Sequence, residues 1–167
     1  MLEQIITFFK SKTINCLFEI TKNLVDTYFK GVTQDDYDMC FSVFPDFYRE
    51  ALELENKYYN QTGKEYIKEI NQSLKSTYGD DYYGYIEPTG ALQLYDGALK
   101  NVESIVKETF GISVKIEDAY EVYFNESIRG NLDATSQESM YIVLKIDGEY
   151  FLYDSYYENI DMDLLRK

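Results

Sequence analysis

Near the start of the chain, apolar side chains recur at the spacing of an α-helix. They form one stripe, made of Leu17, Ile20, Leu24, Val25, Tyr28 and Phe29. This spacing predicts a helix over 2–31 that ends at Gly31, because glycine readily adopts the backbone conformation that closes a helix. Residues 3–12 follow the stripe only approximately, so they either belong to this helix or form a separate one.

Further helices are expected before the middle of the chain. Thr33 can cap a short helix over 34–43, where acidic residues occupy the first turn. Pro45 begins the segment "PDFYREALELENKYYN", and proline is well tolerated at the start of a helix. Another apolar stripe follows Gly63 in "KEYIKEINQSLKSTYG" and ends at Gly79.

After Asp81 the apolar period changes to that of β-strands. The segment "YYGYIEPTGALQLY" favours extended structure, although Pro88 and Gly90 argue for an edge strand or a bulge. A helix is expected over 97–110. The segment "ISVKIEDAYEVYFNESI" then alternates as a strand does, and a polar turn over 130–137 follows it.

The last strand pair, "SMYIVLKIDGEYFLYDSYY", meets at Asp147-Gly148. An Asp-Gly pair between two alternating runs predicts a two-residue type I′ turn, which places Val143 opposite Leu152. The face expected to be the stronger core face carries Met140, Ile142, Leu144, Ile146, Phe151 and Tyr153. The other face is half apolar and carries Tyr141, Val143, Lys145, Tyr150, Leu152 and Asp154.

This half-apolar face is the candidate ligand or partner surface. It can line a pocket for a small apolar ligand. It can also be a surface through which the chain associates with itself or with a protein partner, because aromatic patches with charged rims mark interfaces. Alternatively, the N-terminal segment, or the tail around Ile160 and Leu164, folds over it. The sequence leaves these alternatives open.

The order of elements predicts an α+β fold, with helices packed on one face of a curved antiparallel sheet of about four strands. The sheet ends in the Asp-Gly hairpin. We expect a single domain over 1–167, with an N-terminal helical extension over 1–16 and a C-terminal tail over 158–167.

Two stretches carry a resemblance to a known superfamily. The segment "LVDTYFKGVTQDDYDMCFSVFPDFYREAL" is similar to the opening helix, tight turn and second helix of cystatin-like, nuclear-transport-factor-2-like domains. The segments "GISVKIEDAYEVYF" and "SMYIVLKIDGEYFLYD" resemble the closing strands of small bacterial members. The resemblance implies a cone-like fold. Members include envelope domains of unknown function, isomerases, dehydratases and assembly subunits, so it does not choose an activity.

Charge and composition exclude several classes of function. A net charge of −14 repels phosphate backbones and anionic lipids, so we expect neither a nucleic-acid partner nor membrane insertion. The chain has no histidine, which removes the commonest general base and zinc ligand. Cys16 and Cys40 stand among apolar residues and are expected to be buried thiols. The 18 tyrosines suit half-buried surfaces and interfaces.

The compartment is predicted from the first residues. Lys10 and Lys12 interrupt the first apolar run, so it is neither a spanning helix nor a secretory segment. As written, the chain is expected in the cytoplasm; it is extracytoplasmic if an upstream signal has been removed.

Asp118 and Asp154 are the weak catalytic candidates. The known isomerase pocket of the resembled superfamily uses a carboxylate base with a tyrosine. Asp118 lies between Ile116 and Tyr120, at one of the alternating strand positions that apolar residues otherwise occupy, so its side chain is expected to face the core. An acid that faces a core is a candidate general base. Alternatively, a bulge or strand start at "EDA" turns Asp118 out to water.

No cofactor and no metal site is expected. Asn159, Asp161 and Asp163 begin like a calcium-binding loop, but Leu164 stands where that loop needs glycine.

The sequence favours a non-catalytic domain that recognises a protein or small ligand through its sheet face or cone pocket. Two alternatives remain open. One is an enzyme of the isomerase or dehydratase type that uses a pocket aspartate with a tyrosine. The other is an acidic protein of the immunity type that neutralises a basic partner.

Overall fold

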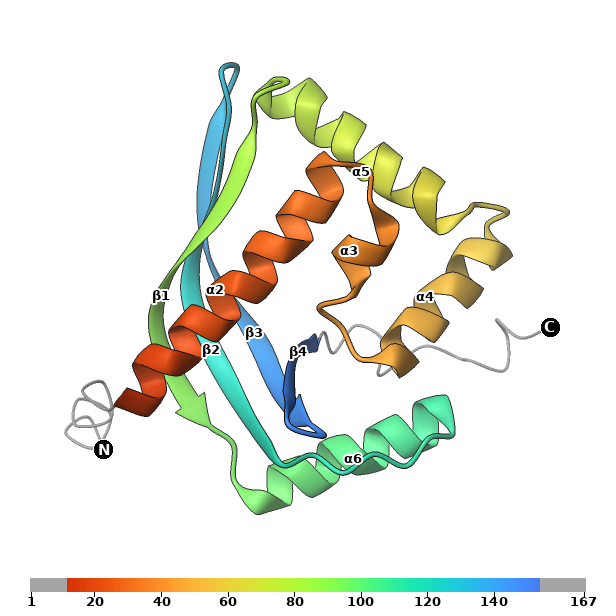
Figure 1. The fold of residues 1–167 in the computed structure, drawn as a ribbon, viewed down its shortest axis with the longest axis vertical. Coiled ribbons are helices and arrows are strands. Elements are labelled where there is room, and N and C mark those ends of the chain that lie inside the picture. Colours follow the sequence, from red (N-terminus) through yellow and green to blue (C-terminus); the bar gives the residue numbers. More distant parts are fainter. Residues whose placement is uncertain (1–11, 154–167) are drawn as a thin grey trace.

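The computed structural model of the chain describes residues 12–153 (Figure 1). The helices before the sheet are α2 (Lys12–Thr33), α3 (Tyr37–Phe41), α4 (Asp46–Tyr58) and α5 (Gly63–Tyr78). The remaining elements are β1 (Tyr83–Gln93), α6 (Asp96–Phe110), β2 (Asp118–Arg129), β3 (Ala134–Ile146) and β4 (Glu149–Tyr153). The strands form one four-stranded antiparallel sheet in the order β1-β2-β3-β4. The predicted α+β class is confirmed.

Helix α2 lies across one face of the sheet (Figure 1). Its apolar stripe and the facing strand residues form one buried cluster, which includes Leu17, Val25, Phe29, Ile86, Tyr120, Val122, Phe124, Val143 and Leu152. Full burial of a side chain of this size contributes about 1.5–3 kcal/mol relative to leaving it exposed. This packing fixes which face of the sheet is internal.

Helix α6 covers part of the opposite face. Ala119 and Leu144 alternate along their strands with the residues beneath α2, so their side chains point to the other face of the sheet. Both are nevertheless completely buried, and they belong to a second cluster that includes Val102 and Val106 of α6. The ring of Phe110 also lies 5.1 Å from that of Phe47, which ties α6 to α4. We expected helices on one face only. The sheet is instead covered on both faces at the end near α6.

Local signals set several boundaries correctly. Thr62 and Glu65 form the capping box at the start of α5, and Gly79 ends that helix with a positive φ of 107°. The predicted bulge in the first strand is confirmed, because the register shifts between Pro88 and Gly90.

The terminal hairpin follows the predicted pairing. Asp147 and Gly148 both have positive φ, 51° and 82°, as a type I′ turn requires. Val143 pairs with Leu152. The residues of the predicted strand before Asp118 are not in a strand, and the structure does not describe the predicted tail over 158–167.

The junction of α2 and α3 differs from the sequence prediction. Helix α2 continues through Gly31 to Thr33, and the side chain of Asp36, not Thr33, caps α3 by accepting from the Met39 N–H at 2.9 Å. Gly31 is needed because a Cβ there would lie 2.5 Å from the backbone nitrogen of Cys40. Close approach of two helices, and not helix termination, explains this glycine.

Gly31→Ala should therefore destabilise the protein. Alanine favours a helix by about 1 kcal/mol over glycine, but the added methyl meets backbone, and overpacking of this kind costs about 1–3 kcal/mol. We expect a lower free energy of unfolding in urea. Asn23→Ala, at an exposed position of the same helix, is the control and should be neutral or slightly stabilising. A Gly31→Ala protein as stable as the control would contradict the close-packing account.

The two cysteines should react differently. Cys40 is buried as expected, but Cys16 is exposed, so its predicted burial is wrong. Burial, and then the charge of Asp36, raises the pKa of the Cys40 thiol to about 12, so little thiolate forms near neutrality. An aromatic disulfide reagent at pH 8 should titrate one thiol per folded chain and both after denaturation. Rapid reaction of both in the folded protein would be inconsistent with this packing.

Candidate ligand-binding pocket

The half-apolar face of the hairpin lies inside the fold. Val143 and Leu152 are 0% and 2% exposed and belong to the cluster under α2. Tyr141 and Tyr150 are partly buried and pack against the same cluster. Asp154 lies outside the described residues. Helix α2 thus covers the centre of this face, which leaves Val143 and Leu152 out of reach of an external partner.

Next to this covered region is a pocket of about 550 Å³. Its lining residues come from α2, α3, α4 and α5 and the adjoining loops on the helical side and from β2, β3 and β4 on the sheet side. Its apolar and aromatic lining consists of Val25, Tyr28, Phe29, Phe41, Phe44, Tyr48, Leu52, Tyr59, Tyr66, Ile70, Leu74, Ile128, Tyr141 and Leu152. Two residues of the predicted surface, Tyr141 and Leu152, therefore line a pocket.

Four further polar residues complete the lining: Glu55, Asn56, Gln61 and Glu126. Glu126 lies on β2 between Phe124 and Ile128, on the face that α2 covers. Its Oε2 accepts from Gln137 Nε2 at 3.2 Å and from Ser139 Oγ at 3.4 Å. Both donors are neutral and hold the carboxylate on the sheet side of the pocket.

Asn56 and Tyr28 supply hydrogen-bonding groups from the helices. Asn56 is 4% exposed, and within the described part of the chain its buried amide nitrogen has no hydrogen-bond partner. A buried donor left unpaired is costly, which marks this position as unusual. Burial, followed by the effect of neighbours that include Tyr141 and Glu126, raises the pKa of Tyr28 far above its ordinary value. The Tyr28 hydroxyl therefore keeps its proton.

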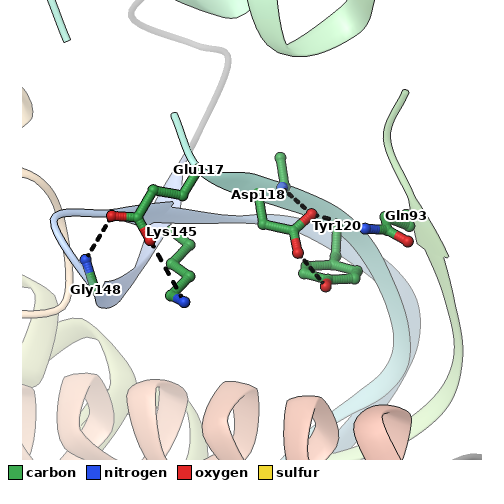
Figure 2. Close-up of polar contacts among 7 residues, drawn as sticks. Gln93, Glu117, Asp118, Tyr120, Lys145 and Gly148 are labelled. Carbon is green, nitrogen blue, oxygen red and sulfur yellow. Dashed lines mark hydrogen bonds and ion pairs between the residues drawn. The ribbon is translucent and has the colours of Figure 1, made fainter. Parts of the chain in front are cut away.

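Asp118, the first catalytic candidate, lies elsewhere. Figure 2 shows it at the start of β2, where its carboxylate accepts from Tyr120 Oη at 2.5 Å, Gln93 Nε2 at 3.0 Å and the Ala119 N–H at 3.1 Å. It is not among the lining residues, and it precedes Glu126 by eight positions, roughly 26 Å along an extended strand. Asp118 stabilises the end of the sheet and does not face the pocket.

Lys145 likewise has a structural role. Its ammonium lies 3.4 Å from the Glu117 carboxylate and 5.7 Å from the centre of the Tyr150 ring. The same carboxylate accepts from the Gly148 N–H at 3.0 Å, which ties the hairpin turn to the residue before β2 (Figure 2). Lys145 is thus paired within the fold and is absent from the pocket lining.

Sequence reasoning missed Glu126, one of the two carboxylates that line the pocket, although the signal was present. Glu126 lies between Phe124 and Ile128, at one of the alternating strand positions that apolar residues otherwise occupy. The same pattern made Asp118 a candidate. Asn56 could be found in the same way, since it continues the buried side of α4 after Leu52. The alternation of residues along the strand does not by itself show which of the two acids, Asp118 or Glu126, lies beside the pocket.

Comparison of the chain with protein-family models, with curated proteins and with solved structures gave no match. The resemblance to cystatin-like domains stays a prediction, and the function must be argued from the pocket itself.

Within residues 12–153, no helix combines the length and apolar character needed to cross a bilayer. That part of the chain also has no group of three or more His, Cys, Asp or Glu side chains placed to hold a metal ion.

Tyr120→Phe should lower stability because it removes a buried donor from Asp118. A hydrogen bond to a charged group contributes about 1.5–3 kcal/mol, and Tyr120 is only 7% exposed. Burial and the bond to Asp118 also raise the pKa of Tyr120, so its proton is present at any working pH. Unfolding in urea measures the decrease in the free energy of unfolding.

Tyr123→Phe is the matched control for this substitution. Tyr123 donates to Glu121 with the same spacing on the same strand but is 42% exposed, so its loss should cost little. Equal effects of the two substitutions would show that the Asp118 contact is not the stabilising one.

Proposed function

We propose that the protein is a non-catalytic domain that binds a small, largely apolar ligand in the pocket between its helices and its sheet. The observation that carries the proposal is a pocket of about 550 Å³ with aromatic walls and four polar lining residues, of which Asn56 is buried and the others are partly exposed. Ligand sites are typically concave, mostly apolar and about 300–1,000 Å³ in volume, with few polar groups to orient the ligand.

The placement of the candidate acids supports binding over catalysis. Binding requires only the pocket and its polar groups. A proton transfer of the isomerase type would need a carboxylate of the pocket lining, Glu126 or Glu55, as its base, since Asp118 lies outside the lining and already accepts from three donors. The hydrogen bonds from Gln137 and Ser139 hold the Glu126 carboxylate in one position, where it can contact a bound molecule.

A pocket-filling substitution tests the proposal. Nile red, a neutral apolar dye, should bind saturably to the protein with a blue shift of its emission. Leu74→Trp adds a ring system in the pocket and should weaken dye binding by about tenfold or more, which corresponds to about 1.4 kcal/mol. Fluorescence titration measures both affinities.

The control is the same substitution away from the pocket. Leu132 is 69% exposed in the turn between β2 and β3, so Leu132→Trp should leave dye binding unchanged. Circular dichroism confirms that each variant is folded. No saturable binding by the wild type, or equal weakening by both variants, would refute the proposed function.

A second candidate function, self-association, is favoured by the sheet face opposite α2. Beyond the part that α6 covers, this face exposes a row of large side chains: Tyr83, Leu92, Tyr123 and Met140. Tyr85 lies on the same face, stacked against Tyr83 at 5.9 Å and beneath the Arg129 guanidinium. Exposed apolar patches with charged margins are typical of protein interfaces. This face is not the one expected from the sequence.

Self-association through this face is tested by mass in solution. A protein with both Tyr123→Ser and Met140→Ser should dissociate to monomers at concentrations where the wild type is a dimer. Tyr95→Ser removes an equally exposed tyrosine, 77% exposed, from the segment between β1 and α6 and should leave the dimer intact. A monomeric wild type would rule this candidate out.

A further inference from the structure

We infer that the pocket selects ligands that carry a positive charge, such as an ammonium group, on an apolar body. This inference rests on the proposed function and specifies the ligand class of the same pocket.

The charge of the lining gives the first support. Among the described residues that line the pocket, Glu55 and Glu126 are acidic, and none is lysine or arginine. A cation entering the pocket therefore meets carboxylates and no repelling charge. Partial removal from water strengthens this attraction relative to the surface of the protein. An anionic ligand of the same shape would be disfavoured for the same reason.

Glu126 is the residue placed to contact such a cation. Its hydrogen bonds come from the neutral groups of Gln137 and Ser139, which orient the carboxylate without cancelling its charge. It takes no part in the ion pairs that Arg49 forms with Asp38 and Lys145 forms with Glu117. A ligand ammonium would supply the charged partner, and charge-assisted hydrogen bonds are the stronger kind.

The aromatic walls add a second attraction for a cation. Phe44 stacks on Tyr48 with ring centres 4.6 Å apart and meets the edge of Tyr28 at 6.1 Å, and all of these residues line the pocket. The faces of aromatic rings attract ammonium groups, and more strongly when water is excluded. The same rings bury the apolar body of the ligand.

The unpaired amide of Asn56 is an independent sign of a missing partner. Asn56 lines the pocket and is 4% exposed, and its amide nitrogen has no partner in residues 12–153. A ligand oxygen that accepts from this amide would remove the cost of leaving it unpaired. The natural ligand is therefore expected to carry an acceptor oxygen in addition to its cationic group.

Three probes that differ only in their head group test the charge preference. They are 4-phenylbutylamine, a cation at pH 7, the neutral 4-phenylbutanol and the anionic 5-phenylpentanoate, which all place four methylene groups between the ring and the head group. Isothermal titration calorimetry should give an affinity for the amine at least about tenfold higher than for the alcohol, with the acid weakest. Displacement of Nile red places each probe in the pocket.

Removal of the carboxylate should abolish the preference. Glu126→Gln keeps the shape of the side chain and should bring the amine within about threefold of the alcohol, while the affinity for the alcohol stays the same. Glu138→Gln, at an exposed position of β3, is the matched control and should retain the preference. If Glu126→Gln does not fold, Glu55→Gln provides the second variant and should reduce the preference.

The outcomes separate the two proposals. Equal affinities for amine and alcohol, or a preference that survives in both Glu126→Gln and Glu55→Gln, overturn the inference and leave the binding function intact. If none of the probes binds while Nile red still binds saturably, the inference alone is overturned, and if Nile red does not bind either, the proposed function fails with it.

Discussion

The packing of α2 against the sheet is the contact on which the rest of the structure depends. One stripe of the helix buries the middle of every strand on that face, from Ile86 through Val122 and Val143 to Leu152. The close approach at Gly31 brings α3 against α2, and residues of α3, α4 and α5 then line the pocket together with α2 and the sheet. The pocket is the space that these helices and strands enclose, so its position follows from the position of α2.

Local chemistry could be predicted well from the sequence. The Asp-Gly turn and the disturbance at Pro88 depend on a few neighbouring residues, and the structure has them as expected. Contacts between distant segments could not be predicted in this way. Gly31 was interpreted as a helix stop because nothing nearby reveals that Cys40 packs against it. The covering of Leu144 by α6 is a long-range contact of the same kind.

The candidate site was predicted in part for the same reason. Alternation correctly separated the two faces of the hairpin and grouped Tyr141 with Leu152, and both line the pocket. It could not show that α2 covers Val143, nor that the acid beside the cavity is Glu126 and not Asp118. Both acids lie on the same face of β2, but only Glu126 lines the pocket, while Asp118 accepts from Gln93, Ala119 and Tyr120. This difference depends on the tertiary fold.

The central claim is that the inside of this fold, and not its open sheet face, is the binding site. Nuclear magnetic resonance of leucine methyl groups during titration with 4-phenylbutylamine tests it most directly. The account predicts shifts of Leu52, Leu74 and Leu152, which line the pocket, with Leu92 and Leu132 unchanged. Shifts at Leu92 on the open face without shifts at Leu74 and Leu152, or no shift at saturating probe, would contradict it.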